Sequence, residues 1–402
     1  MRVLVVHNAY QHKGGEDSVM EAEVTMLAAR GHSIMLFLRH NDSIHKKFRI
    51  VTAFQTIWSA PVGQEFEATL RSFKPDVVHV HNTFPLISPS IYWVADRLGV
   101  PVVQTLHNFR LLCPQAMFLR NGKICEDCLG KLPWRGIVRG CYRESKAQST
   151  ILAGMITLHR SVGTWKNKIS RYIALNEFCR RKFIAGGLPA HRIMVKPNFV
   201  DFEFQLSGLR SGFLFVGRLS SEKGVAVLVE AARAVSFSNI RVAGTGPEAS
   251  LLFGVKNITE LGSMSSDDVR MEMGGAMALL LPSIWYENFP RTLVEAFGSG
   301  LPVIASRIGA LAELVEDGVT GLLFEPGNSQ DLAEKMQWAH QHPEKMAEMG
   351  RNARVLYETE FTADRNHHQL ITIYEAAINA TKERLKHDFT ESEDSPGIAN
   401  IN

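Results

Sequence analysis

The sequence of 402 residues lacks a long apolar run and lacks a strong excess of either charge. No window approaches the ~20 apolar residues that a membrane-spanning helix needs. A net charge of +3, from 44 basic and 41 acidic side chains, is too balanced to predict a nucleic-acid partner. The first residues, M-R-V-L-V-V-H-N, hold too short an apolar run for a signal peptide. We therefore expect a cytoplasmic protein without nucleic-acid binding.

Cysteine is also scarce, with five residues in the chain. In a cytoplasmic protein these are expected to be reduced thiols or metal ligands rather than disulfides. Four of them fall in an insertion at 113–141 with the spacing C-x11-C-x2-C-x12-C, namely Cys113, Cys125, Cys128 and Cys141. This spacing would suit a tetrahedral structural zinc site, although only one arm has the close C-x2-C pair. Buried reduced thiols and a redox pair are the alternatives.

Two motifs of other nucleotide-dependent enzymes are missing. The full G-x-G-x-x-G loop is not found, and no Asp-x-Asp follows a strand to carry Mg²⁺. What stands after the first predicted strand, Arg2–His7, is the pair Gly14-Gly15, followed by a predicted helix from Asp17 to Arg30. The glycine pair either lets backbone N–H groups approach a phosphate or forms a plain turn.

The first half alternates short buried-strand patterns with stretches long enough for helices. Further strands are predicted at Ser33–Leu38, Asp76–Val80, Val100–Leu106 and Ile173–Ala174. Such alternation predicts a parallel sheet with right-handed crossovers, that is, a Rossmann-like domain. A domain boundary is expected at about residue 200.

Histidines stand at the carboxyl ends of two of these strands, where ligands of such sheets bind. We expect His107 to face the cleft. His79 and His81 are weaker candidates, because we expect these two histidines of one strand to point to opposite faces.

The second half repeats the pattern. Strands are predicted at Phe213–Val216, Ile240–Ala243, Ile258–Leu261, Ala276–Leu281 and Pro302–Ala305. The sequence thus predicts an α/β protein of two doubly wound, Rossmann-like domains facing a cleft between them.

Charged residues gather at the predicted strand ends of this second half. Arg218 and Lys223 lie in the loop after its first strand and before a helix, where a diphosphate would meet two cations and free backbone N–H groups. The stretch 282–298 follows another strand and contains Glu287 in a loop and Glu295 on a helix that starts near Pro290. Each feature alone is also compatible with an ordinary solvated loop.

A long helical stretch is expected over 145–171, with cations near its end. Trp165 and Tyr172 accompany these cations, Lys166, Lys168 and Arg171. The combination suits either a lipid surface or ordinary amphipathic packing.

Several motifs, in this order and spacing, resemble those of glycosyltransferase family 4, a group of retaining, nucleotide-sugar-dependent enzymes. The resemblance covers most of the chain and rests on K-P-D-V-V-H-V-H-N, T-L-H-N-F-R-L-L-C-P, F-V-G-R-L-S-S-E-K-G, A-G-T-G-P-E and E-N-F-P-R-T-L-V-E-A-F-G. It implies a GT-B fold. The acceptor would bind mainly in an N-terminal domain, 1–200, and the donor in a C-terminal domain, 201–365. A helix at 366–386 would pack back on the first domain, and 387–402 would be a disordered tail.

The resemblance also implies roles for individual residues. Arg218 and Lys223 would bind the donor diphosphate, Glu295 the ribose, and Glu287 would lie beside the donor sugar. His107 would lie near the reacting sugar and Gly14-Gly15 near phosphate. Asn288 and Phe289 stand where Gly-Phe is commoner and are assigned to the donor site; Arg291 is an added cation without an expected role.

The expected reaction is transfer of a sugar to a glycan, a lipid-linked glycan or another hydroxyl acceptor in cell-surface polysaccharide biosynthesis, with retention and without a catalytic metal. A UDP-, GDP- or ADP-sugar is the only cofactor expected besides the zinc. The acceptor suggests peripheral contact with the inner face of a membrane. The alternatives are a nucleotide-sugar epimerase on the same fold and a non-catalytic nucleotide-binding protein.

Overall fold

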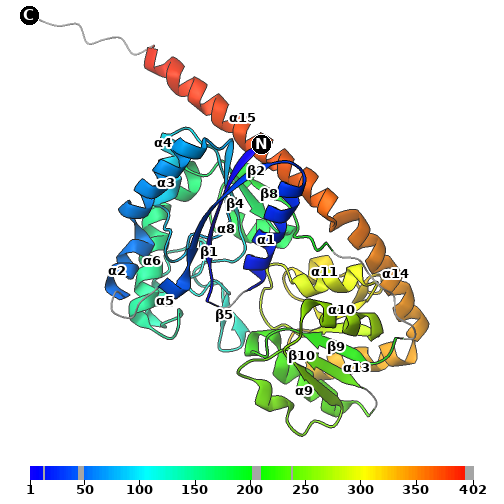
Figure 1. Ribbon diagram of the computed structural model, residues 1–402. Helices are drawn as coiled ribbons and strands as arrows, with labels where there is room; N and C mark the ends of the chain where they lie inside the picture. Colours follow the sequence, from blue (N-terminus) through cyan, green and yellow to red (C-terminus); the bar gives the residue numbers. More distant parts are fainter. Residues whose placement is uncertain (12–13, 44–48, 202–209, 237–238, 394–402) are drawn as a thin grey trace, which may run out of the picture.

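The computed structural model describes residues 1–11, 14–43, 49–201, 210–236 and 239–393. Two six-stranded sheets, parallel throughout, form the centres of two α/β units, one above the other in Figure 1. The upper unit is coloured blue to green and the lower one green to orange. The predicted pair of doubly wound sheets is therefore confirmed.

The first sheet has the order β2-β1-β3-β4-β7-β8. Its strands are β1 (Arg2–Ala9), β2 (Ser33–His40), β3 (Val77–Val80), β4 (Val102–Thr105), β7 (Arg171–Ala174) and β8 (Ile193–Val195). The order reverses between β1 and β3, so that the loops leaving these strands diverge and leave a crevice. The inner strands β1, β3 and β4 are buried on both faces, which explains their many Val and Leu residues, whereas the edge strand β2 is largely exposed.

The second sheet has the order β11-β10-β9-β12-β13-β14. Its strands are β9 (Phe213–Val216), β10 (Ile240–Ala243), β11 (Ile258–Gly262), β12 (Ala278–Leu281), β13 (Val303–Ser306) and β14 (Gly321–Phe324). Here the order reverses between β9 and β12. The two loops that carry the predicted cations and acids leave these two strands.

Helices cover both faces of each sheet. In the first unit they are α1 (Gly15–Ala29), α2 (Arg49–Ile57), α3 (Ala60–Phe73), α4 (Ser90–Arg97), α5 (Trp134–Val138), α6 (Lys146–Ser161), α7 (Thr164–Asn167) and α8 (Glu177–Ala185). In the second they are α9 (Val225–Ala234), α10 (Ser266–Gly275), α11 (Arg291–Gly298), α12 (Leu311–Leu314), α13 (Ser329–Gln341) and α14 (Pro343–Glu360). None of the helices described is both long and apolar enough to cross a membrane.

The insertion at 113–141 forms a small hairpin of β5 (Leu119–Arg120) and β6 (Lys123–Ile124) before α5. Asn121 and Gly122 make its turn with positive φ of 50° and 69°. That geometry and the Asn-Gly sequence are those of a type I′ turn, which matches the twist of the two strands.

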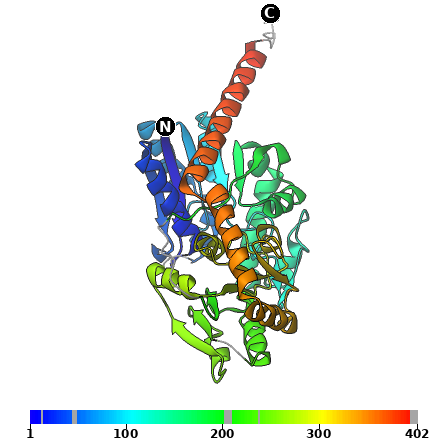
Figure 2. The same ribbon diagram turned by 90° about the vertical axis from the view of Figure 1, so that its right-hand side faces the viewer.

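The last helix, α15 (Ala363–Glu393), returns from the second unit to the first. Figure 2 shows it running diagonally along the molecule from the lower unit past the upper one. Its Leu370, Ile373 and Tyr374 are buried in one core cluster with Val3 and Val5 of β1. The predicted return of the C-terminal helix is thus observed, but the helix continues to Glu393, so residues 387–393 are helical where a disordered tail was predicted. Residues 394–402 lie outside the described part.

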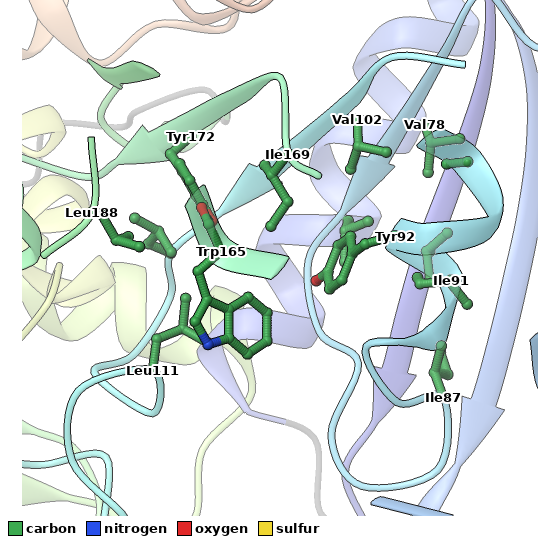
Figure 3. Close-up of a cluster of buried hydrophobic side chains, with 14 of the residues drawn as sticks. Val78, Ile87, Ile91, Tyr92, Val102, Leu111, Trp165, Ile169, Tyr172 and Leu188 are labelled. Carbon is green, nitrogen blue, oxygen red and sulfur yellow. The ribbon is translucent and has the colours of Figure 1, made fainter. Parts of the chain in front are cut away.

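The long helix predicted over 145–171 is wrong in its second half. The helix ends at Ser161, and Gly163, with φ of +74°, starts the separate short helix α7. Trp165 and Tyr172 are 4% and 0% exposed, and the Tyr172 hydroxyl donates to the Trp165 carbonyl oxygen at 2.7 Å. Figure 3 shows both rings inside the apolar cluster of the first unit. They belong to the core, so neither ring provides a lipid contact.

Candidate active site

Two loops meet at the switch point of the second sheet. The loop 217–224 leaves β9 and the loop 282–290 leaves β12, and the Ile284 N–H donates to the Glu222 carbonyl oxygen at 3.0 Å. Gly224 has φ of +73°, and a Cβ there would lie 1.8 Å from the Pro282 carbonyl oxygen. Glycine is therefore required for the two loops to approach this closely.

An ion pair joins these loops. Lys223 Nζ lies 2.6 Å from Glu287 Oε1, and the Ser283 hydroxyl donates to the same oxygen at 2.7 Å. Glu287 is only 5% exposed, whereas the Lys223 side chain is 27% exposed. The structure thus brings together the predicted cation and the predicted acid. The exposed Arg218 lies five residues earlier in the same loop.

The second acid, Glu295, has its own cation. Arg291 Nε donates to Glu295 Oε1 at 2.9 Å across one turn of α11. Burial raises the pKa of Glu295, and the arginine opposes this effect. The position of Arg291, for which the sequence gives no role, is therefore explained: it fixes the Glu295 carboxylate.

Asn288 and Phe289 face protein rather than one common ligand pocket. Phe289 packs against Phe361, with ring centroids 5.9 Å apart. The Asn288 carbonyl oxygen accepts from Asn176 Nδ2 at 2.5 Å, while its own buried Nδ2 has no hydrogen-bond partner within the protein. Of these two residues, Asn288 retains a side-chain N–H group, at Nδ2, that can hydrogen-bond to a bound ligand.

His107 lies at the carboxyl end of β4, as predicted. Its Nε2 and His81 Nδ1 share a hydrogen bond of 2.9 Å, and the two rings are stacked. Burial lowers the pKa of His107 to about 3, although Glu23 opposes the shift. The imidazole is therefore neutral near pH 7 and can orient a group by hydrogen bonding without adding charge.

The prediction that His79 and His81 point to opposite faces is wrong. Residues two apart along a strand lie on the same face, and His81 follows directly after β3, so the two rings lie on one side of the sheet. The two rings lie 4.2 Å apart, and His79 accepts from or donates to both Thr105 and Tyr374 at 2.8 Å. Burial lowers the pKa of both histidines well below the ordinary value.

Behind the histidines lies a buried ion pair that the sequence analysis missed. Lys196 Nζ lies 2.6 Å from Glu23 Oε1, and both side chains are almost fully buried. Within the described residues, Glu23, His79 and His81 form the one group of three potential metal ligands whose atoms lie within 4.8 Å of one another. Lys196 balances the charge of Glu23 through Oε1, while Glu23 Oε2 and His81 Nε2 are buried without a hydrogen-bond partner within the described residues.

The glycine pair lies at the N-terminus of α1, where Gly14 is the N-cap and Gly15 the first helical residue. The Gly14 N–H donates to Asp17 Oδ2 at 2.7 Å, and Asp17 Oδ1 lies 2.8 Å from His7 Nε2. The Gly14 N–H is therefore already bonded. No neighbouring atom lies within 4 Å of a Cβ placed on Gly15, so the backbone there is open.

The next residue, Glu16, was not predicted as a site residue. Its Oε2 accepts from the Tyr10 hydroxyl at 3.2 Å and from Asn108 Nδ2 at 3.4 Å, and its Oε1 is buried without a partner. Burial raises the pKa of Glu16 to about 8, against the opposing effect of Arg110. It lies beside the His107 loop through Asn108, a contact that no sequence spacing indicates.

Contacts between the two units were also missed. Asn176, two residues after the end of β7, caps α8 and donates to the Asn288 carbonyl oxygen. The Phe178 N–H donates to Glu313 Oε2 at 2.6 Å. Tyr286 packs on Phe178, with centroids 4.7 Å apart. These contacts fix the loop that carries Glu287 to the first unit.

The four cysteines of the insertion are free thiols; Cys113 and Cys128 are buried, and Cys125 and Cys141 are half-buried. Cys141 N–H donates to the Gly136 carbonyl oxygen at 3.0 Å, and Cys125 Sγ accepts from Arg139 at 3.7 Å. No three of these described sulfurs lie within 4.8 Å of one another. Burial raises the pKa of Cys128 to about 11, and Cys113, Cys141 and Cys125 lie near enough to add to this effect, so the four thiols are neighbours. The structural zinc site remains a prediction, which metal analysis of protein purified without chelator would test.

Two family profiles match nearly the whole chain. Residues 13–204 match "Glycosyltransferase Family 4", and 202–356 match "Glycosyl transferases group 1". A protein of Methanocaldococcus jannaschii, described as an uncharacterized glycosyltransferase, is 32% identical over 325 residues, which are 78% of each chain. The chain belongs to the family 4 glycosyltransferases.

Solved structures of the same fold agree with this assignment. Sucrose-phosphate synthase from Thermosynechococcus elongatus matches with a TM-score of 0.69 at 18% identity, over 94% of this chain and 99% of that one. Anabaena HepE in complex with UDP and glucose matches with a TM-score of 0.66 at 19% identity, over 93% and 99%. The fold of this glycosyltransferase is therefore GT-B.

Proposed function

We propose that this glycosyltransferase moves a sugar from a nucleoside diphosphate sugar to a hydroxyl of a glycan or lipid-linked glycan, with retention at the anomeric carbon. The contact between Lys223 and Glu287 carries the proposal. It places a cation and a carboxylate together where the second sheet reverses its order, the position at which such sheets bind ligands. The UDP and glucose in the complex of Anabaena HepE are consistent with a nucleotide-sugar donor.

In the proposed reaction, the bond from the anomeric carbon to the diphosphate breaks as the bond to the acceptor oxygen forms on the same face of the sugar. The acceptor proton passes to the departing phosphate oxygen. Lys223 and Arg218 stabilise the negative charge that develops on the diphosphate, so the chemistry has no need of a catalytic metal. On this proposal EDTA leaves the rate unchanged.

The remaining residues position the reactants. Glu287, held by Ser283 and Lys223, lies on the side of the donor sugar and faces its hydroxyl groups. Glu295, fixed by Arg291, binds the ribose hydroxyls. His107 is neutral near pH 7, so it accepts or donates a hydrogen bond to the transferred sugar without repelling the cationic anomeric carbon.

The test begins with the donor. Thermal shift against UDP-, GDP- and ADP-sugars selects the nucleotide, and acceptor trials with that donor are followed by NMR of the product's anomeric proton. Lys223→Ala and Glu287→Ala are each expected to lower transfer by about 10²- to 10³-fold in a folded protein. Near-normal rates in both variants would refute the proposed site, and conversion of the donor without any acceptor would favour an epimerase.

A further inference from the structure

Half of the large apolar side chains exposed on the described surface lie on three neighbouring helices of the first unit and the loops beside them. Of fourteen such side chains, seven belong to α2, α5, α6 and their flanking residues. Phe54 and Trp58 lie at the end of α2 and are 70% and 47% exposed. Single exposed apolar residues are common on soluble proteins, whereas a cluster on adjacent elements indicates a contact surface.

The other members lie in or next to α5 and α6. Leu132, Trp134 and Val138 are 61%, 57% and 59% exposed, and Leu158 and Val162 are 43% and 46% exposed. We call the seven residues the apolar face. A tryptophan this exposed is unusual on the surface of a soluble protein. It is typical of a side chain that lies between water and an apolar phase.

Packing joins the three helices into one surface. Both α2 and α5 pack against α6. The Trp58 ring is stacked on His159 of α6, with centroids 6.3 Å apart, and Arg160 of α6 donates to the Lys131 carbonyl oxygen at 2.9 Å. Figure 1 shows α2, α5 and α6 together on one side of the first unit.

The charge around the apolar face is predominantly positive, although Arg135 and Arg139 both pair with Asp127. Between Cys128 and Asn176 the chain has nine Lys or Arg residues and a single acid, Glu144. The rest of the chain therefore has more acids than bases, because the net charge of the whole is only +3. Lys131 lies next to Leu132, and the Arg135 guanidinium lies 5.5 Å from the Trp134 ring, so the cations border the apolar residues directly.

We propose that the apolar face, with the cations around it, is a docking surface for an anionic lipid bilayer. Aromatic and aliphatic side chains would enter the interface between headgroups and acyl chains, and the cations would contact the anionic headgroups. This partner is chosen because the surface combines large apolar groups with an excess of positive charge, which a second copy of the same surface would repel. The surface differs from the predicted lipid contact, whose Trp165 and Tyr172 are buried.

The insertion at 113–141 connects the apolar face to the loop 282–290, which carries Glu287. It contains Leu132, Trp134 and Val138, and its Glu126 contacts both Lys182 of α8 and Tyr286, the residue before Glu287. A bilayer on the apolar face would therefore hold a membrane-bound acceptor near the site. In this respect the inference rests on the proposed function and names the phase from which the acceptor comes.

The test uses the full chain and sedimentation with vesicles. Binding is expected to vesicles of equal parts phosphatidylcholine and phosphatidylglycerol, and to be weaker to phosphatidylcholine alone and at high salt. Trp134→Ser with Phe54→Ser should lower binding to the anionic vesicles by at least about tenfold. Lys131→Gln with Arg135→Gln should lower it by about fivefold for each charge removed.

Phe253→Ser is the matched control, because Phe253 is 88% exposed on the second unit, away from the apolar face. It should not change vesicle binding. Equal binding to both kinds of vesicle, or an equal loss in the Phe253 variant, would overturn the proposal. So would a dimer in sedimentation equilibrium that dissociates in the Trp134 and Phe54 variant, because the face would then be an interface between copies.

Turnover separates this inference from the proposed function. With a water-soluble acceptor, the variants with weakened vesicle binding should transfer sugar at the rate of the unchanged protein. Anionic vesicle binding without any sugar transfer would refute the function alone, and transfer without vesicle binding would refute the docking surface alone.

Discussion

Lys223 Nζ contacts Glu287 Oε1 at 2.6 Å, so the cation predicted to bind diphosphate is paired with the acid predicted to lie beside the sugar. A donor that enters must share or displace this contact. The cost of separating the pair is offset by the phosphate charges, which only a charged donor supplies. A free sugar is therefore expected to bind poorly.

The first prediction concerns this pair. Lys223→Ala leaves Glu287 buried with Ser283 as its remaining partner, so we expect the free energy of unfolding to fall by about 1–3 kcal/mol. Lys223→Arg keeps the charge and should recover most of this stability, though not the full rate, because a planar guanidinium replaces a point charge. Chemical denaturation and initial rates measure the two effects; an unchanged stability in the alanine variant would contradict the observed contact.

The second prediction concerns Glu295 and Arg291. Glu295→Gln should raise the KM for the donor by about tenfold or more with a smaller change in kcat, because a charged hydrogen bond to the ribose is lost. Arg291→Gln should act in the same direction but less strongly, since it frees the carboxylate to move without removing it. A deoxyribose donor should bind equally to the Glu295 variant and the unchanged protein. A large fall in kcat with unchanged KM would place Glu295 at the reacting centre instead.

The third prediction follows from Glu16. Its pKa of about 8 means that the folded protein keeps a proton that the unfolded chain releases at the ordinary carboxyl pKa. The free energy of unfolding should therefore fall as the pH rises from the ordinary carboxyl pKa to about 8, by about 1.4 kcal/mol for each unit of the pKa shift. Above pH 8 it should stay level. Glu16→Gln should remove this slope from thermal unfolding curves, while Glu21→Gln, on the exposed side of the same helix, should keep it.

The fourth prediction concerns the contact between the two units. Asn176 accepts from the Cys179 N–H at 2.8 Å and donates to the Asn288 carbonyl oxygen at 2.5 Å. Asn176→Asp keeps the helix cap but loses the donor, whereas Asn176→Ala loses both. We expect kcat to fall by about tenfold to a hundredfold in both, because the loop with Glu287 is displaced. The alanine variant should also lose about 1 kcal/mol of stability. A normal kcat in the aspartate variant would show that the contact does not position the loop.

The sequence predicts the sheets well because the strands are short apolar runs buried on both faces. Phe213–Val216 and Ile240–Ala243 agree with the structure residue for residue. The edge strands β8 and β14 were not predicted. The helix of 145–171 was overextended because the left-handed conformation of Gly163 depends on the fold and not on local periodicity.

The candidate site was predictable where motif and strand end coincide. Lys223, Glu287 and His107 follow strands that the pattern identifies. Glu16 and Asn176 were missed because their partners, Asn108 and Asn288, are about a hundred residues away in the chain. Such pairings arise only when the strands of the sheet and the two units are brought together.

The return of α15 affects how the chain is made. Leu370, Ile373 and Tyr374 complete the core that β1 begins, and Tyr374 bonds His79 at 2.8 Å. The first unit therefore cannot finish folding during synthesis until nearly the whole polypeptide has left the ribosome. A fragment that stops before α15 would leave exposed the apolar side chains of Val3 and Val5, which this helix covers.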